Sequence, residues 1–123
     1  MTDEKFAAVV AAVLRQSRLR LSTERALQDS IAEVLTAAKI PFEREKALSK
    51  RDRPDFLLAD GRVVLEAKFK YPKKAIYRQL ARYAEHDQVT VLMLITGTAM
   101  GMVDTIQDKP VVMISAGMGS MGC

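Results

Sequence analysis

The spacing of hydrophobic residues along the chain predicts three helices. In these segments apolar side chains recur every three or four positions, which is typical of a helix with one buried face. Ser22 precedes the second segment and is a suitable N-cap, because its hydroxyl can accept a hydrogen bond from the first turn. The predicted helices cover residues 3–19, 23–39 and 73–85.

Shorter apolar runs between and after these helices predict strands. Residues 42–48 alternate in polarity, and residues 89–96 are almost uninterruptedly apolar, as expected of a strand buried on both faces. A short helix around residues 99–107 and a final strand at 111–115 complete the pattern. This order predicts an α/β fold, with a mixed central β-sheet flanked by helices.

A predicted β-hairpin between residues 54 and 68 is the clearest local pattern. Its apolar arms flank Asp60-Gly61, a dipeptide that favours a two-residue type I′ turn. That turn pairs Phe56 with Leu65, and so places Asp55 directly opposite Glu66. A longer loop would shift the pairing, and a slip of one residue would turn Glu66 to the other face.

Two acids opposite each other need a neutralising partner, because like charges on paired strands are destabilising. Mg²⁺ binds carboxylate oxygens and could supply this charge. Lys68 lies two residues beyond Glu66 and therefore on the same face of the strand. The other interpretation is a solvated hairpin face that happens to carry two acids and a lysine, and the spacing alone leaves both open.

The motif Pro54-Asp55, ten intervening residues, then Glu66-Ala67-Lys68 resembles the signature of the PD-(D/E)xK nuclease superfamily. The resemblance extends over residues 22–96, where helix, strand, hairpin, helix and strand follow one another. It implies a restriction-endonuclease-like αβββαβ core, preceded here by an extra N-terminal helix. It also implies that Asp55, Glu66 and the backbone carbonyl of Ala67 bind Mg²⁺ or Mn²⁺, while Lys68 orients or helps to activate the attacking water.

Two further features strengthen this resemblance. Glu24 falls on the inward stripe of the second helix, where family members often carry a glutamate that can bind a second ion or anchor the lysine. A first-turn carboxylate stabilised by the helix dipole is the alternative. Gln79 and Tyr83 resemble the Gln-x-x-x-Tyr motif of the RecB-like branch, and they share a helix face with Ile76 and Leu80. Taken alone, this face is also compatible with an ordinary amphipathic helix.

Charge distribution favours a nucleic-acid partner. The net charge is only +4, but residues 68–82 hold six basic residues, two interleaved tyrosines and no acid. Such a strip beside a metal site is expected to bind the phosphate backbone; a solvated helix face is the other interpretation. The residues expected to contact DNA are Lys70, Lys73, Lys74, Arg78, Arg82 and Tyr83, with Arg53 from a second basic cluster before the hairpin.

Length and composition bound the remaining possibilities. The 123 residues suffice for one core domain at 22–116, with the helix of residues 1–21 packing on it or forming a dimer surface, and with a flexible tail at 117–123. No apolar run reaches a membrane-spanning length, so we expect a cytoplasmic protein. A single cysteine, Cys123, excludes an internal disulfide. His86 is expected to be a surface residue at a helix end.

These features together predict a Mg²⁺-dependent nuclease acting on duplex or branched DNA, for example a junction resolvase working as a homodimer. One alternative is a non-catalytic nucleic-acid-binding or assembly subunit that keeps the nuclease fold. Another is a Mg²⁺-dependent hydrolase of a small phosphate compound, which would not need the basic strip.

Overall fold

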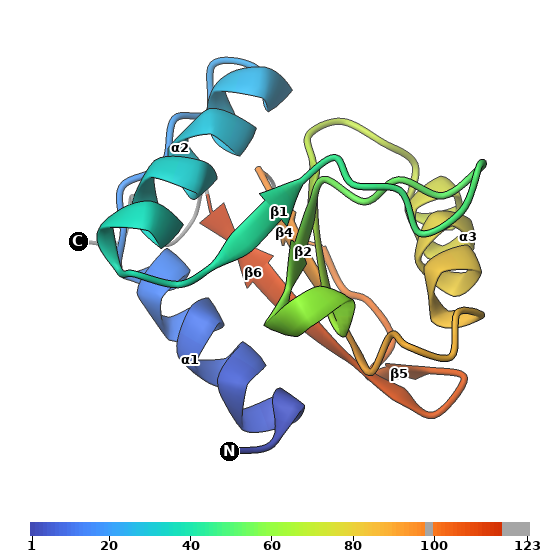
Figure 1. The fold of residues 1–123 in the computed structure, drawn as a ribbon. Helices are drawn as coiled ribbons and strands as arrows, with labels where there is room; N and C mark the ends of the chain where they lie inside the picture. Colours follow the sequence, from blue (N-terminus) through green and yellow to red (C-terminus); the bar gives the residue numbers. More distant parts are fainter. Residues whose placement is uncertain (98–99, 117–123) are drawn as a thin grey trace.

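A six-stranded mixed sheet forms the centre of the molecule (Figure 1). The computed structural model describes residues 1–97 and 100–116, and within them the strands lie in the order β1-β2-β3-β4-β6-β5. The predicted α/β class with a mixed sheet is confirmed. The elements are α1 (Asp3–Arg15), α2 (Glu24–Ala37), β1 (Phe42–Arg44), β2 (Phe56–Leu58), the short 3₁₀ turn η1 (Ala59–Gly61), β3 (Val63–Lys68), α3 (Lys73–Ala84), β4 (Val91–Thr96), β5 (Thr105–Ile106) and β6 (Lys109–Ser115).

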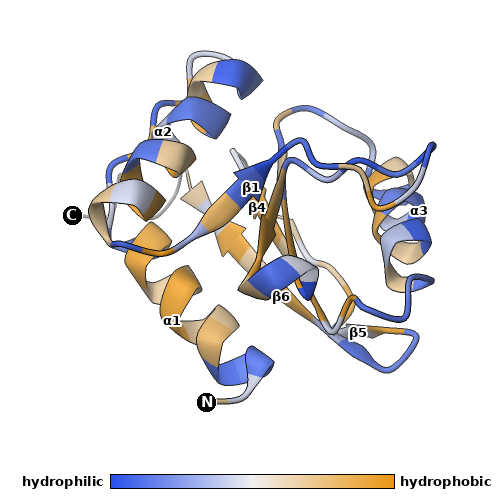
Figure 2. Ribbon diagram, in the orientation of Figure 1, coloured by the Kyte–Doolittle hydropathy of each residue, from blue (hydrophilic) through white to orange (hydrophobic). Residues whose placement is uncertain are grey.

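Helices cover both faces of the sheet, with α1 and α2 on one side and α3 on the other (Figure 1). Because side chains alternate along a strand, Phe56 and Leu65 pack toward α1 and α2, whereas Leu57 and Val64 pack toward α3. Helix α1 is apolar over most of its length (Figure 2), and it buries Ala7, Val10, Ala11 and Leu14 in the core on this side of the sheet. Of the two placements predicted for the N-terminal helix, the structure shows packing on the core.

The hairpin has the predicted register. Leu58 pairs with Val63, and Phe56 pairs with Leu65. Asp60 and Gly61 have φ values of 56° and 89°, both in the left-handed region that a type I′ turn requires, and the N–H of Arg62 donates to the carbonyl of Ala59 at 3.2 Å. The two-residue turn therefore sets which side chains oppose each other further along the arms.

Local backbone geometry shifts the start of α2 and the end of β1 from the residues that the hydrophobic pattern predicts. Thr23 rather than Ser22 caps α2, since its hydroxyl oxygen accepts a hydrogen bond from the Ala26 N–H at 3.0 Å. Strand β1 ends at Arg44, short of the predicted residue 48, because Glu45 adopts a φ of 53° that an extended strand does not allow.

The helix predicted around residues 99–107 is wrong. Residues 105–106 instead form β5, which pairs with the start of β6. Gln107 and Asp108 connect them with φ values of 52° and 65°, so a tight left-handed turn replaces the expected helix end. Ile106 is buried against the α3 side of the sheet, which secures the hairpin. Residues 98–99 and the predicted tail at 117–123 lie outside the described residues.

The carboxyl ends of the parallel strands β3, β4 and β6 meet at one edge of the sheet, where Lys68, Thr96 and Ser115 are in register. Helix α3 begins shortly after Lys68, and α2 begins close by, with Glu24 in contact with the residue after β3. The ends of these elements form the candidate site. Within the described residues, no helix has the length and apolar character needed to cross a membrane.

Candidate active site

Asp55 and Glu66 lie together, as the hairpin register predicts. The N–H of Asp55 donates to Oε1 of Glu66 at 3.1 Å, and the N–H of Ala67 donates to Oδ2 of Asp55 at 2.8 Å. Each carboxylate therefore accepts a hydrogen bond from the main chain of the opposite arm. These reciprocal bonds lie one step beyond Phe56 and Leu65, the last pair of the β2–β3 ladder, and hold both acids at the end of the sheet.

Lys68 completes this group on the same face. Its Nζ lies 3.2 Å from Oε2 of Glu66 and 4.4 Å from the ring centroid of Tyr71. The Lys68 side chain is 11% exposed and that of Glu66 only 3%. One lysine thus faces two acids in a largely desolvated setting.

The electrostatics of the acid pair reflect this shortage of positive charge. Burial, and then the neighbouring charge of Asp55, raise the pKa of Glu66 to about 7 despite the opposing effect of Lys68. Burial also raises the pKa of Asp55, and the charges of Glu24 and Glu45 add to the effect, while the Ala67 N–H and Lys68 lower it. A further cation would stabilise both carboxylates in their ionised form.

Glu24 reaches this end of the sheet from the opposite layer. It is the first residue of α2, and its Oε1 accepts a hydrogen bond from the N–H of Phe69 at 3.1 Å. Phe69 directly follows β3, so Glu24 holds the chain beside Lys68. The prediction that Glu24 turns inward, toward the hairpin, therefore agrees with the geometry.

The donors at the site fit a hard divalent cation by their chemistry. Asp55, Glu66 and the carbonyl of Ala67 offer oxygen atoms, which Mg²⁺ and Mn²⁺ prefer. Within residues 1–97 and 100–116, no three side chains of Asp, Glu, His or Cys lie close enough together to hold a metal ion. A cation here would rely on two carboxylates, the backbone oxygen and water, which is the usual way in which proteins hold Mg²⁺.

Gln79 and Arg82 approach the site from α3. Together with Lys68 and Tyr71 they line a cleft of about 220 Å³. Their spacing of three residues places both on the flank of α3 that faces the end of β3. The structure thus places Gln79 and Lys68 along the same cleft.

Tyr83 requires a correction. It was expected to contact nucleic acid, but it is 1% exposed and belongs to the core under α3. Burial, together with the charges of Glu66 and Asp55, raises the pKa of its phenol, which therefore stays protonated. Tyr83 therefore packs in the core next to the site and cannot contact a bound nucleic-acid strand.

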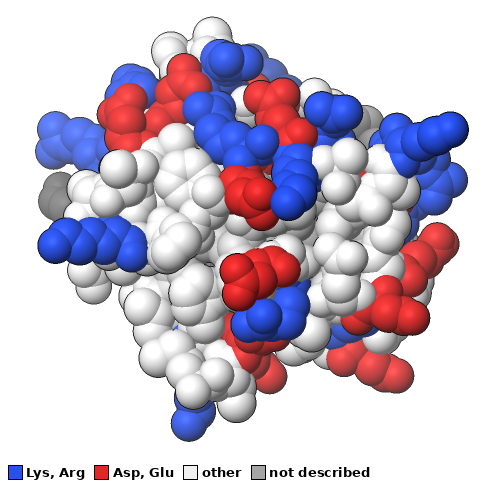
Figure 3. Space-filling view, in the orientation of Figure 1, with Lys and Arg blue, Asp and Glu red and all other residues white. Residues whose placement is uncertain are grey.

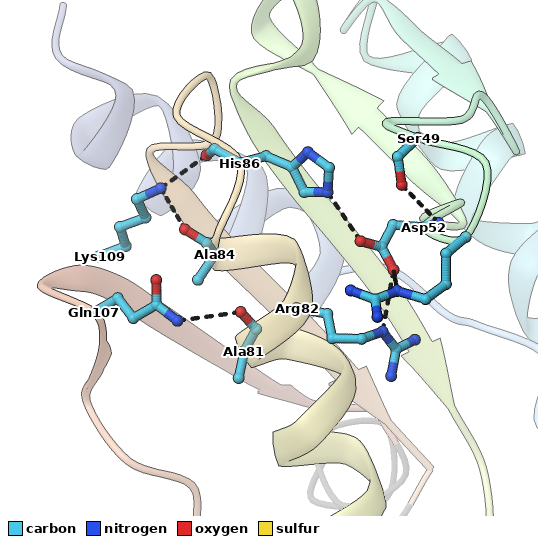
Figure 4. Close-up of polar contacts among 9 residues, drawn as sticks. Ser49, Asp52, Ala81, Arg82, Ala84, His86, Gln107 and Lys109 are labelled. Atoms are coloured by element: carbon cyan, nitrogen blue, oxygen red, sulfur yellow. Dashed lines mark hydrogen bonds and ion pairs between the residues drawn. The ribbon is translucent and has the colours of Figure 1, made fainter.

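Asp52 is the buried acid at the centre of a charged cluster that the sequence pattern did not predict (Figure 4). Its carboxylate accepts hydrogen bonds from Nε of Arg82 at 3.1 Å and of Arg51 at 3.4 Å, and its other oxygen lies 2.9 Å from Nε2 of His86. Asp52 is 2% exposed. His86, expected at the surface, is instead a half-buried partner of this acid.

The cluster joins α3 to the loop that leads into Asp55. Arg82 was expected to contact DNA, but its Nε is engaged by Asp52, so its first role is to connect these two segments. Figure 4 also shows Lys109, whose Nζ donates to the carbonyls of Ala84 and His86 at 2.6 and 2.8 Å. A lone acid in the basic run Lys50-Arg51-Asp52-Arg53 was the available sequence signal.

Five other basic residues of the predicted DNA-binding set have exposed side chains. Lysine and arginine side chains gather over the loop between β1 and β2 beside α3, while acids gather toward the opposite end of α3 (Figure 3). Arg53 is exposed, and its Nη1 donates to the carbonyl of Glu45 at 3.3 Å. The exposed members of the predicted strip are Lys70, Lys73, Lys74 and Arg78.

Comparison of the chain with protein-family models, with curated proteins and with solved structures found no match.

Proposed function

We propose that this protein is a Mg²⁺-dependent nuclease with a restriction-endonuclease-like core. The observation that supports the proposal is the pair formed by the buried Glu66 and the half-buried Asp55, held by reciprocal main-chain hydrogen bonds beside Lys68. Two adjacent, largely desolvated acids with raised pKa values destabilise a fold, and perturbed groups of this kind are typical of functional sites. A divalent cation would offset that cost.

Each residue of the site would have a separate role in phosphodiester hydrolysis. Asp55, Glu66 and the Ala67 carbonyl would hold the ion, which when bound polarises the phosphate and lowers the pKa of a coordinated water. Lys68 would orient that water and stabilise the negative charge that develops on the phosphate. Glu24 fixes the backbone after Lys68, and Gln79 shapes the cleft in which the phosphate would lie.

DNA is the proposed substrate because of the charge around the cleft. Exposed basic residues lie on the segment that follows β3 and on the loop before β2, and a long polyanion can contact both groups at once. A duplex or branched DNA fits this description, and a homodimer would present two such edges.

Cleavage assays test the catalytic proposal. Supercoiled, linear, single-stranded and four-way-junction DNA are incubated with Mg²⁺, Mn²⁺ or EDTA. We expect metal-dependent cutting by the wild type and a loss of roughly 100-fold or more in Asp55→Asn and Lys68→Met, because each removes a group that acts on the transition state. Asp60→Asn is the matched control, since this acid lies exposed in the same hairpin and Asn tolerates its left-handed φ.

A non-catalytic DNA-binding subunit is the second candidate. The ion pair between Lys68 and Glu66 favours it, because this lysine already neutralises one carboxylate without a metal. Calorimetric titration with Mn²⁺ separates the two proposals independently of activity. The nuclease predicts binding that Glu66→Gln abolishes, whereas the binding subunit predicts no metal uptake and DNA binding that is equal in the wild type and in Asp55→Asn.

A further inference from the structure

A second concave surface lies beside α3. It is a groove of about 480 Å³ with apolar walls formed by Tyr77, Met102 and Val103. Tyr77 is 42% exposed and Val103 is 45% exposed, so the groove is open to solvent. The charged residues that line it are all basic: Lys73, Lys74 and Arg78.

Helix α3 lies between this groove and the cleft of the candidate active site. Ala75 and Gln79 lie on the flank of α3 that faces the cleft, whereas Lys73 and Tyr77 lie on the other flank, because residues four apart share a side. Lys74 and Arg78 occupy the exposed crest between the two flanks. A strand crossing α3 would cover roughly 10 Å, the diameter of a helix, between groove and cleft.

The lining of the groove matches one class of occupant. An apolar wall with an exposed aromatic ring can stack against a nucleobase, and the surrounding cations can pair with the adjoining phosphates. A groove that carries three positive charges repels the same surface of a second copy of this chain. Bases within a blunt duplex are stacked on one another and cannot enter, so the base must be unpaired.

We propose that the groove formed by Tyr77, Met102 and Val103 binds an unpaired nucleobase of a strand whose backbone crosses α3 toward the cleft. The inference rests on the proposed function, because the strand is the substrate of the nuclease. It narrows that substrate to DNA with single-stranded, frayed or branched character. Tyr77 is then a specificity-determining residue that contacts substrate away from the acid pair.

Binding measurements without metal test the proposal separately from catalysis. Fluorescence anisotropy in EDTA follows a labelled oligothymidylate and a blunt duplex of equal length. We expect Tyr77→Leu to weaken oligothymidylate binding about tenfold, as loss of one base–aromatic stacking contact predicts, and to change duplex binding less than twofold. Tyr77→Phe keeps the ring and should bind like the wild type, while Val103→Glu should weaken single-strand binding by repelling the phosphates.

Photocrosslinking locates the contact. An oligothymidylate containing 5-iododeoxyuridine, irradiated with long-wavelength ultraviolet light, should crosslink to Tyr77 and give a modified peptide by mass spectrometry. Equal effects of Tyr77→Leu on both DNAs, no effect on either, or dissociation of a dimer in this variant would overturn the proposal.

The same experiments keep the two proposals apart. Selective loss of single-strand binding in Tyr77→Leu, with no cleavage by the wild type, would support the groove and reject the nuclease. Cleavage by the wild type with unchanged single-strand binding in Tyr77→Leu would support the nuclease and reject the groove.

Discussion

The burial of Glu66 beside a second acid lowers the stability of the fold. It is 2% exposed, lies beside a second acid, and pairs with a lysine that faces both. The position of this acid was predictable from sequence, because an Asp60-Gly61 turn and strand alternation determine the pairing. The partners of Asp52 were not predictable, because His86 is 34 residues away and meets it only through the packing of α3.

The stability of the metal-free protein should therefore fall as pH rises. The pKa of Glu66 in the fold, about 7, exceeds its ordinary value of 4.5, so the folded state binds more protons between these values. Its stabilising contribution is complete below pH 4.5 and is lost as pH rises through 7. The free energy of unfolding in EDTA should decrease by about 3 kcal/mol between about pH 5 and pH 8, at about 1.4 kcal/mol per pKa unit.

Urea unfolding followed by circular dichroism at both pH values measures this decrease. Glu66→Gln should remove most of the dependence, and Mg²⁺ should restore stability at pH 8 in the wild type but not in Glu66→Gln. An equal pH dependence in wild type and Glu66→Gln would contradict the prediction. Asp60→Asn, in the same hairpin, serves as the control.

At the scale of elements, the contact between α3 and the β1–β2 loop depends on Asp52. Burial alone would raise its pKa, but hydrogen bonds from His86 and Arg82 outweigh that effect, and the pKa lies below its usual value. The ionised form thus contributes stability above pH 4, which is lost as pH falls through the lowered pKa. This is the opposite direction from Glu66.

We expect Asp52→Ala to destabilise the fold by about 2 kcal/mol, because Arg82 and His86 lose a charged acceptor. Amide hydrogen exchange should increase in residues 46–54 and in the last turn of α3, which are the two segments that Asp52 joins. Asp87→Ala, an exposed acid near the same helix end, should change neither quantity. Unaltered exchange in Asp52→Ala would show that the loop is held by other contacts.

The hydrophobic pattern predicted the long elements well. All three helices begin within a residue of the predicted start, because each has a continuous apolar stripe. Strand β5 was missed, since Gln107-Asp108 forms a left-handed turn without the Gly or Asn that normally signals one. The shortening of β1 had no signal, because an ordinary glutamate adopts the positive φ.

Across the whole molecule, separate basic segments surround one edge of the sheet. If that edge binds a polymer, each cation that meets a phosphate contributes to the salt dependence of binding. Lys70→Glu and Arg53→Glu should each reduce the slope of log K against log salt by about one. Lys39→Glu, an exposed control just after α2, should leave the slope unchanged. A hydrolase of small phosphate compounds would show no such dependence, so equal slopes in all variants would reject a polymer substrate.

The two-residue turn at Asp60-Gly61 also limits how this hairpin can change length. One residue added to each arm keeps Asp55 across from Glu66, whereas a single unmatched residue parts them and turns one carboxylate into the opposite layer. Insertions into this hairpin should therefore be tolerated only when both arms gain the same number of residues. The turn end of β2 and β3 is then the place where a designed extension leaves the acids opposite each other.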